Sequence, residues 1–347
     1  MITVGIVGTW KNTGKTTALS YIISELNKQK IRIAVTGIGY DGEEFDNITN
    51  LPKPRLLFDR DSIVSTSEKC LVSTELFYKT LEKTDFNTPL GNINIVHTLS
   101  SGMIVVAGPN KKSSLQSFFK MLDKYGIDIL LIDGSLNRIA PLSIADYIIF
   151  ATGASRSTDI NFLAEEMYSI EYIFTFPKFD KSNIYENVTI NNNEGLTSFK
   201  FSSLFDEEDA KTVFNKFSEG NNKLVIPKII SDAALSYIVK NISNKININL
   251  IVESPIAFLL SGNPIQTTNI VKDFVSLGNT ISYINKPNLP AITVNPFYPK
   301  PIDHYYVTEY LDKDLLRNEV SKKLTTKVYD IKANPSGILD FLDVKHL

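Results

Sequence analysis

The sequence predicts an α/β fold in which a doubly wound, mostly parallel sheet forms the first domain and a smaller α/β domain follows. Short apolar runs alternate with amphipathic stretches along the chain, which is typical of parallel strands joined by helices. The length of 347 residues suggests about two domains. The polar stretch 181–200, with consecutive asparagines at 191–193, predicts a loop or short hairpin at the boundary. We therefore expect domains over 1–204 and 205–347.

In the first half, a buried strand is expected at Ile2–Gly8 and a second one at Ile31–Gly37. The helix between them has apolar residues at positions i, i+3, i+4 and i+7, namely Leu19, Ile22, Ile23 and Leu26. Residues 41–100 are less regular and long for a connection, so we expect an insertion that surrounds a site.

Periodicity returns at 103–108, where a strand is expected before a helix with Leu115, Phe118, Phe119 and Leu122 on its apolar face. Later strands are expected at Ile127–Ile132, Tyr147–Ala151, Tyr172–Phe176, Leu224–Ile226, Ile248–Val252, Thr280–Ile284 and Ala291–Val294.

Composition excludes several classes of protein. A hydrophobic content of 43% with 21% charged residues is ordinary for a globular protein and excludes disorder, coiled coil and collagen. The net charge of −2 argues against a nucleic-acid partner. The single cysteine, Cys70, and the scattered His97, His304 and His346 argue against disulfides and a zinc site. Neither a signal peptide nor an apolar run of about 18 residues is found, so we expect a cytoplasmic protein without a membrane partner.

The strongest functional signal is the segment Gly8–Thr17, Gly-Thr-Trp-Lys-Asn-Thr-Gly-Lys-Thr-Thr, between the first strand and the first helix. Backbone N–H groups of such a loop, with the helix N-terminus, bind phosphates. Lys15 is expected to reach the β- and γ-phosphates, and the Thr16 hydroxyl to ligate Mg²⁺. The expected nucleotide-binding residues of the loop are Thr9, Trp10, Lys11, Asn12, Thr13, Gly14, Lys15, Thr16 and Thr17.

This loop departs from the strict phosphate-loop pattern at its beginning. The strict pattern has its first glycine at the position of Thr9, whereas Gly8 lies one residue earlier. An ordinary strand-to-helix turn with a chance Gly-Lys-Thr is the alternative interpretation.

Two groups of acidic residues are candidates for the magnesium side of the site. Asp133 follows the apolar run 127–132, and the carboxyl end of a buried parallel strand is where a phosphate-loop enzyme presents such a carboxylate. Gly134 would let the backbone approach the γ-phosphate, although Asp133 could instead cap a turn. Asp41, with Glu43 and Glu44, follows the second strand and could coordinate Mg²⁺ or position a water, unless these are ordinary exposed acids. The expected catalytic residues are Lys15, Asp133 and Asp41, and the expected metal ligands are Thr16, Asp133 and Asp41.

Two further segments invite a functional interpretation. Lys178 and Asp180 follow the expected strand 172–176, where related folds place a base-reading Asn/Thr-Lys-x-Asp, although Pro177 replaces the amide or hydroxyl residue. The segment 295–306 contains prolines and aromatic residues, which predicts a stiffened loop that contacts a partner or packs its own aromatic rings.

Several motifs occur in order at 5–17, 37–43, 105–109, 132–135 and 291–296. The first resembles the phosphate loop of the signal-recognition/MinD-type NTPase class, which includes the molybdopterin-guanine-dinucleotide accessory protein. The series resembles the B-subunit family of lysine 5,6-aminomutase reactivases. In one large branch of these NTPases a second lysine lies five residues before the phosphate-loop lysine, whereas Lys11 precedes Lys15 by only four, which favours a solvated Lys11.

The resemblance implies a chaperone-like NTPase with Mg²⁺ and ATP or GTP as cofactors. Such a protein would act with a MutS-like ATPase subunit to eject damaged cobalamin from the adenosylcobalamin-dependent lysine 5,6-aminomutase. The resemblance assigns Gly14, Lys15, Thr16 and Asp133 to the nucleotide and Mg²⁺. The sequence lacks the cobalamin-binding pattern Asp-x-His-x-x-Gly.

Two other functions fit the same residues. An ATP-dependent phosphotransferase or ligase of the dethiobiotin-synthetase type would use 41–100 as its substrate pocket. A nucleotide-binding module would bind tightly without hydrolysis. The residues do not distinguish ATP from GTP.

Overall fold

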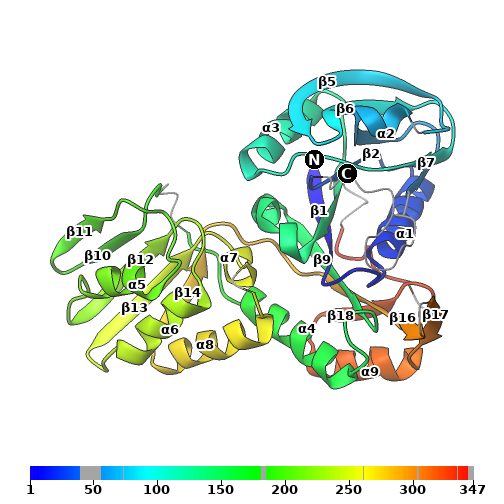
Figure 1. The fold of residues 1–347 in the computed structure, drawn as a ribbon. Coiled ribbons are helices and arrows are strands. Elements are labelled where there is room, and N and C mark those ends of the chain that lie inside the picture. The colour runs from blue at the N-terminus through cyan, green and yellow to red at the C-terminus, as the bar shows by residue number, and fades with distance from the viewer. Residues whose placement is uncertain are drawn as a thin grey trace. The chain divides into compact units, whose positions relative to one another are not determined.

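Parallel strands joined by helices form the first of two units in the chain (Figure 1). The computed structural model describes residues 1–39, 56–72, 74–180, 185–260, 262–302, 305–333 and 335–342. Unit 1 comprises Met1–Ala164 and Leu289–Leu347, and unit 2 comprises Glu165–Asn288.

The main sheet of unit 1 has the order β18-β15-β9-β1-β8-β2-β4-β6-β5 within the described residues. Neighbouring strands from β18 to β4 are parallel, whereas β6 is antiparallel to both β4 and β5. The strands are β1 (Ile2–Gly8), β2 (Ile33–Gly37), β4 (Ile63–Ser67), β5 (Tyr78–Thr88), β6 (Gly91–Thr98), β8 (Ile129–Ser135), β9 (Tyr147–Gly153), β15 (Ala291–Asn295) and β18 (Lys327–Asp330). Two separate antiparallel ribbons pair β3 (Leu56–Phe58) with β7 (Gly102–Ile104), and β16 (Phe297–Ile302) with β17 (Tyr305–Tyr310).

Helix α1 (Lys15–Lys28) begins directly after the loop that follows β1. Its side chains Leu19, Ile22, Ile23 and Leu26 are buried in the core between the helix and the sheet, as the helical spacing predicted. Each such burial contributes about 1.5–3 kcal/mol, so the apolar face holds α1 against the sheet. The other helices of this unit are α2 (Glu68–Val72), α3 (Lys112–Asp123), α9 (Lys313–Lys323) and two short 3₁₀ helices, Leu136–Arg138 and Ala140–Ile144.

Unit 2 has a five-stranded sheet with the order β11-β10-β12-β13-β14 within its described residues. Side-chain caps define several of its helices: Asp206, Ser231 and Asn263 accept hydrogen bonds from backbone N–H groups in the first turns of α5, α6 and α8. The elements are β10 (Thr189–Asn192), β11 (Gly195–Ser198), α5 (Glu207–Phe214), β12 (Gly220–Ile226), α6 (Asp232–Asn241), β13 (Ile246–Val252), α7 (Ile256–Leu259), α8 (Pro264–Ser276) and β14 (Thr280–Tyr283).

The observed organisation differs from the expected one in three places. Residues 289–347 return to unit 1, where β15 and β18 extend the main sheet beside β9, so the chain does not divide at 204. Part of the insertion expected over 41–100 lies outside the described residues, and within 56–104 the strands β4, β5 and β6 extend the main sheet itself. The expected strand at Tyr172–Phe176 is wrong, because helix α4 (Ile160–Phe174) covers most of it.

The helical alternative at α4 has a clear physical basis. Leu163, Met167, Ile170 and Phe174 are buried and follow one another at spacings of three or four residues. A short apolar run cannot by itself distinguish a strand from the end of a buried helix. None of the described helices is long and apolar enough to cross a bilayer.

The buried side chain of Tyr283 is expected to make the stability of unit 2 depend on pH. Its side chain is fully buried, and its hydroxyl donates to the carbonyl of Ile173 at 2.6 Å. Burial raises the pKa of this phenol well above 10.0. The folded chain therefore keeps a proton that the unfolded chain releases above about pH 10, and the free energy of unfolding falls there by about 1.4 kcal/mol per pH unit.

We expect Tyr283→Phe to lower the free energy of unfolding by about 1 kcal/mol near neutral pH, because the carbonyl of Ile173 loses its hydrogen-bond donor. The variant lacks the alkaline penalty, so its unfolding free energy should approach that of the wild type as the pH rises past about 10. Urea unfolding at several pH values measures both curves. If the difference between the two unfolding free energies stayed constant above that pH, Tyr283 would not be the group that makes stability depend on pH.

Candidate functional site

The carboxyl ends of β1, β8 and β9 meet at one edge of the main sheet. Gly8 at the end of β1 lies beside Ser135 of β8 and Ala151 of β9. The backbone N–H of Thr9 donates to the carbonyl of Ala151 at 2.9 Å, which continues the pairing by one residue. The loop 9–14 therefore starts from the middle of a rigid sheet.

Two left-handed residues shape this loop. Asn12 has φ 60°, and Gly14 has φ 87° directly before α1. In the described part of the chain, the backbone N–H groups of 13–17 donate to no backbone carbonyl, and the first turn of α1 has no acidic residue. Alternating right- and left-handed residues aim successive N–H groups at one point and form an anion-binding concavity. Together with the helix N-terminus, this loop can bind phosphate oxygens.

Gly8 explains how a loop without the expected first glycine folds. A Cβ at Gly8 would lie 3.0 Å from Oγ1 of Thr13 and 3.2 Å from the carbonyl oxygen of Trp10. The hydroxyl of Thr13 donates to that carbonyl at 2.9 Å. Gly8 thus allows the loop to fold back over the end of its own strand.

The side chains of the two buried threonines of the loop make contacts within the fold, which leaves the expected role of the loop backbone in binding nucleotide a prediction. The hydroxyl of Thr9 lies 3.4 Å from the carbonyl oxygen of Ala151 and 3.3 Å from the hydroxyl of Thr152. Thr9 is 3% exposed and Thr13 is 1% exposed. Their side chains fasten the loop internally and to β9.

Lys15 and Asp133 form an ion pair at this edge, with 2.7 Å between Nζ and Oδ1. Asp133 lies on β8 opposite Ile6 of β1 and Gly37 of β2, so the strand that carries it adjoins the strand that leads into the loop. About a quarter of each side chain is exposed, 24% for Lys15 and 26% for Asp133. The pair is therefore partly exposed beside the loop, although Oδ1 of Asp133 is itself buried.

Asn295 braces the loop from the C-terminal part of the chain. Its side-chain amide donates to the carbonyl of Asn12 at 2.9 Å, although 283 positions separate the two residues. Its own carbonyl accepts from Ala154 N–H at 2.9 Å. A Cβ at Gly14 would lie 3.0 Å from the Cβ of Asn295, so this asparagine packs directly against the turn.

Sequence reasoning noted the segment around Asn295 but not this role. The available signal was that Asn295 is a polar residue at the carboxyl end of a buried strand. Beside Asn295, a hollow of about 10 Å³ that is also lined by Thr17 and Asp330 has room for about one water. The C-terminal segment thus closes one flank of the loop.

Trp10 of the loop lies against the cationic side chain of Arg156. Trp10 is 52% exposed, and the guanidinium of Arg156 lies 5.1 Å from the centre of its ring. The same guanidinium lies 5.5 Å from the ring of Phe162. Ser155 donates to the carbonyl of Lys11 at 2.8 Å, which ties this group to the loop. Cation–π contacts of this kind contribute about 0.5–1 kcal/mol each at exposed sites.

The remaining predicted residues fall into three groups. Thr16 is half-buried in the first turn of α1 beside Lys15, while Lys11, Asn12 and Thr17 are exposed on the loop and helix start. Asp41 lies outside the described residues. Lys178 and Asp180 belong to unit 2 and follow helix α4, so the strand on which their base-reading role rested is absent.

The glycine after Asp133 has a packing role that differs from the expected one. A Cβ at Gly134 would lie 3.1 Å from a methyl carbon of Leu142 and 3.5 Å from one of Ile38. Its small size accommodates these apolar side chains. Packing against Leu142 and Ile38 therefore explains the glycine at position 134 without reference to a phosphate.

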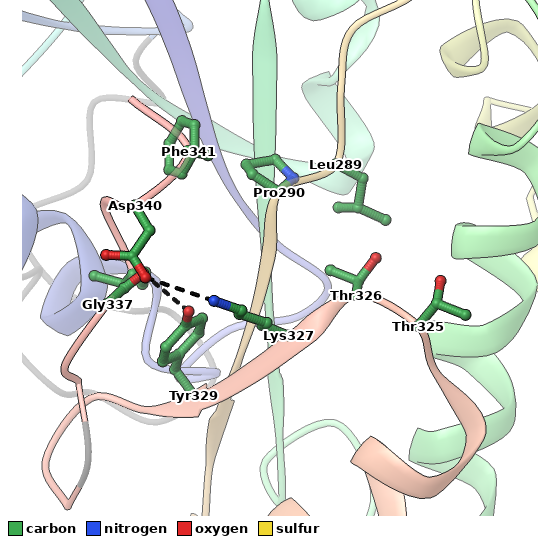
Figure 2. A pocket seen from close by; sticks show the side chains of 10 residues that line it. Leu289, Pro290, Thr325, Thr326, Lys327, Tyr329, Gly337, Asp340 and Phe341 are labelled. Carbon is green, nitrogen blue, oxygen red and sulfur yellow. Dashed lines mark hydrogen bonds and ion pairs between the residues drawn. The ribbon is translucent and has the colours of Figure 1, made fainter. Parts of the chain in front are cut away.

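A larger, open pocket of about 450 Å³ lies where β15 and β18 begin (Figure 2). Lys327 and Asp340 face each other across it at 3.5 Å, and the Tyr329 hydroxyl donates to the carbonyl of Gly337 at 2.9 Å. Ligands of open parallel sheets bind at the carboxyl ends of the strands, whereas this pocket is at the amino ends. It is therefore separate from the loop 9–14.

Comparisons with known proteins add little to this geometry. No protein-family model matches the chain, and no curated protein is detectably similar in sequence. Among solved structures, the chain is similar to pNOB8 ParA bound to nonspecific DNA, with 11% identity over 80% of this chain and 98% of that chain. The TM-score is 0.22, so the functional argument depends on the site itself.

Proposed function

We propose that the chain is a Mg²⁺-dependent NTPase that binds ATP or GTP at 9–17. The observation that carries this proposal is the Lys15–Asp133 ion pair beside a loop whose N–H groups at 13–17 donate to no backbone carbonyl among the described residues. A cation, a carboxylate and a helix N-terminus together match what nucleotide phosphates and their metal need. An ordinary strand-to-helix turn would need neither the ion pair nor the two left-handed residues.

The residues present fit a magnesium ion. Mg²⁺ usually keeps several waters and takes one or two protein ligands together with phosphate oxygens. The Thr16 hydroxyl and the Asp133 carboxylate would supply these ligands. The described residues contain no group of three or more His, Cys, Asp or Glu side chains that could hold a metal alone, which suits a metal that arrives with its nucleotide.

The ion pair suggests how the site responds to nucleotide. Without phosphates, the ammonium of Lys15 neutralises Asp133. With phosphates bound, Lys15 would turn to them and leave the Asp133 carboxylate to hold the metal or its water. Lys15 would then neutralise charge on the γ-phosphate, and a bound Mg²⁺ would supply further electrostatic stabilisation there.

Asp133→Asn tests this exchange. We expect Mg²⁺-dependent hydrolysis to fall by about 100-fold or more, because the variant cannot offer a negative charge to the metal. Nucleotide affinity in excess EDTA should be retained or increased, since Lys15 is no longer held by a carboxylate. Fluorescent ATP and GTP analogues measure affinity with and without Mg²⁺, and phosphate release measures turnover.

Asp128→Asn is the matched control. Asp128 immediately precedes the same strand at its other end, where it pairs with Arg32 at 3.2 Å. This variant should leave both affinity and turnover unchanged. A wild type that binds neither ATP nor GTP would overturn the proposal. If Asp133→Asn kept the wild-type dependence of affinity and hydrolysis on Mg²⁺, Asp133 would not be a metal ligand.

We further propose, from the order of the sequence motifs, that this site serves a lysine 5,6-aminomutase reactivase. The chain would act with a MutS-like ATPase subunit to release damaged cobalamin. The test is turnover with and without the aminomutase and that subunit. Stimulation would support the role. Turnover that depends only on a small acceptor would point to a phosphotransferase or ligase, and binding without turnover would point to a non-hydrolysing module.

A further inference from the structure

The open pocket of about 450 Å³ at the amino ends of β15 and β18 has no part in the proposed nucleotide site (Figure 2). All of the residues that line it belong to unit 1. Its volume lies within the range of about 300–1,000 Å³ that is typical of small-molecule pockets. The pocket therefore has room for a ligand of its own, and its lining indicates which kind.

One wall of the pocket is formed by the last turns of the described chain, and the core of unit 1 holds this wall in place. Ile338 is 2% exposed and belongs to the apolar core. The centre of the Phe341 ring lies 4.8 Å from that of the Tyr147 ring. Tyr329 is buried, and its hydroxyl donates to the carbonyl of Gly337 at 2.9 Å. These contacts fix the wall, so this side of the pocket is preformed.

Two opposite charges face each other in the pocket without closing into a tight pair. Nζ of Lys327 and Oδ2 of Asp340 are 3.5 Å apart, whereas charge-assisted hydrogen bonds of this kind span about 2.7–2.9 Å. Their side chains are 68% and 65% exposed. Ion pairs that are exposed to this extent contribute little to stability. Each of the two groups can therefore exchange the other for an opposite charge on a ligand.

The position of the carboxylate depends on Gly337. This residue has φ 85°, and a Cβ on it would lie 2.8 Å from Oδ2 of Asp340. Without a side chain at 337, this oxygen has the space in which it faces Lys327. The N–H of Asp340 also donates to the carbonyl of Gly337 at 3.1 Å, which joins the two residues in one turn. The local backbone thus places the acid in the pocket.

Apolar side chains contribute much of the remaining lining. They are Leu289, Pro290, Ile338 and Phe341. In the view of Figure 2, Pro290 and Phe341 lie above the two charged groups. A ligand with an apolar part would remove these side chains from water, which favours binding.

The two charged groups decide the charge of the ligand. An anion would gain Lys327 but would meet the carboxylate of Asp340, and a cation would meet the ammonium of Lys327. A neutral molecule would leave the pair as it is. A molecule with a negative and a positive group side by side satisfies both side chains, because its carboxylate faces Lys327 and its ammonium faces Asp340. Free α-amino acids carry these two groups on one carbon.

We propose that this pocket binds a free α-amino acid with an apolar side chain. The carboxylate of the ligand pairs with Lys327, its ammonium pairs with Asp340, and its side chain lies against Pro290 and Phe341. The pocket and the nucleotide site share no residue, so this inference does not depend on the proposed function.

Isothermal titration calorimetry of the full chain with L-phenylalanine and L-leucine tests the proposal, and both are expected to bind. L-Phenylalaninamide lacks the carboxylate, and N-acetyl-L-phenylalanine lacks the ammonium. Each of these derivatives is expected to bind more weakly than L-phenylalanine by about tenfold or more. Glycine keeps both charges but lacks the apolar part, and it is expected to bind more weakly for that reason.

Two variants assign each charge of the ligand to its partner. Lys327→Gln is expected to lower the affinity for L-phenylalanine by about tenfold and to remove the preference over L-phenylalaninamide. Asp340→Asn is expected to lower it by a similar factor and to remove the preference over N-acetyl-L-phenylalanine.

Lys322→Gln and Glu319→Gln are the matched controls, because these residues pair at 2.6 Å on α9 outside the pocket. Both should bind L-phenylalanine like the wild type. The proposal is overturned if neither amino acid binds, if the wild type binds L-phenylalanine and its two derivatives equally, if either pocket variant keeps the wild-type affinity, or if the controls lose as much as the pocket variants. Titration of the same samples with nucleotide tests the proposed function separately.

Discussion

Lys15→Ala is expected to weaken the binding of Mg-ATP and Mg-GTP by about 100-fold and to abolish measurable hydrolysis. Lys15 follows the loop directly, and its ammonium pairs with Asp133 at 2.7 Å. Hydrogen bonds to charged groups contribute about 1.5–3 kcal/mol each, and one such contact accounts for a loss of this size. Titration with a fluorescent nucleotide analogue measures affinity, and phosphate release measures turnover.

Folding must be separated from binding in this experiment, because Lys15→Ala also leaves Asp133 without its cation. Asp133 is 26% exposed, so water can hydrate it and the stability loss should be small. The double variant Lys15→Ala/Asp133→Asn removes both charges. It should restore stability without restoring affinity.

Lys28→Ala is the matched control for charge. Lys28 lies in the last turn of the same helix and pairs with Glu25 on the surface. It should bind and turn over nucleotide like the wild type. Full activity in Lys15→Ala, or equal losses in both variants, would refute the assignment of the phosphate site.

Gly153→Ala is expected to destabilise unit 1 by about 3 kcal/mol and to weaken nucleotide binding at the same time. Gly153 is buried at the end of β9 and faces Asn295 of β15. A Cβ there would lie 2.2 Å from the carbonyl oxygen of Asn295 and 3.0 Å from its Cβ. Backbone must move to relieve this overlap, and Asn295 is the residue that holds Asn12 and packs against Gly14.

Gly278→Ala supplies the contrast. Its Cβ would meet no atom within 4 Å, and its φ of 85° alone makes the substitution unfavourable. This variant of unit 2 should lose about 1 kcal/mol through backbone strain and keep its nucleotide affinity. Thermal unfolding and nucleotide titration compare the two. If Gly153→Ala lowered stability with unchanged affinity, the brace formed by Asn295 would be irrelevant to the site.

Much of the local structure followed from residue patterns. The strand Ile2–Gly8 and the helix with Leu19, Ile22 and Leu26 buried were predicted correctly. A short continuous apolar run is typical of a strand buried on both faces, and the helical period of 3.6 residues is visible within neighbouring turns. The strand Tyr172–Phe176 was wrong. The prediction considered only the five residues 172–176, whereas the helical spacing of buried residues begins near Leu163.

The candidate site was predictable to a smaller extent. Lys15 and Asp133 were identified as partners in function, and the structure brings them to 2.7 Å. Thr9 and Thr13 were assigned to the ligand as members of the loop, because a motif names positions but not the direction of side chains. Their hydroxyls lie against other groups of the fold, and phosphate binding by their backbone stays a prediction.

The sequence by itself determined where the loop lies, since the end of β1 and the start of α1 are local features of 8–17. Only the tertiary structure decided what surrounds that loop. The return of 289–347 to the main sheet brought Asn295 to Asn12 across 283 positions. Strand order depends on which distant apolar faces pack together, and no local pattern records that choice.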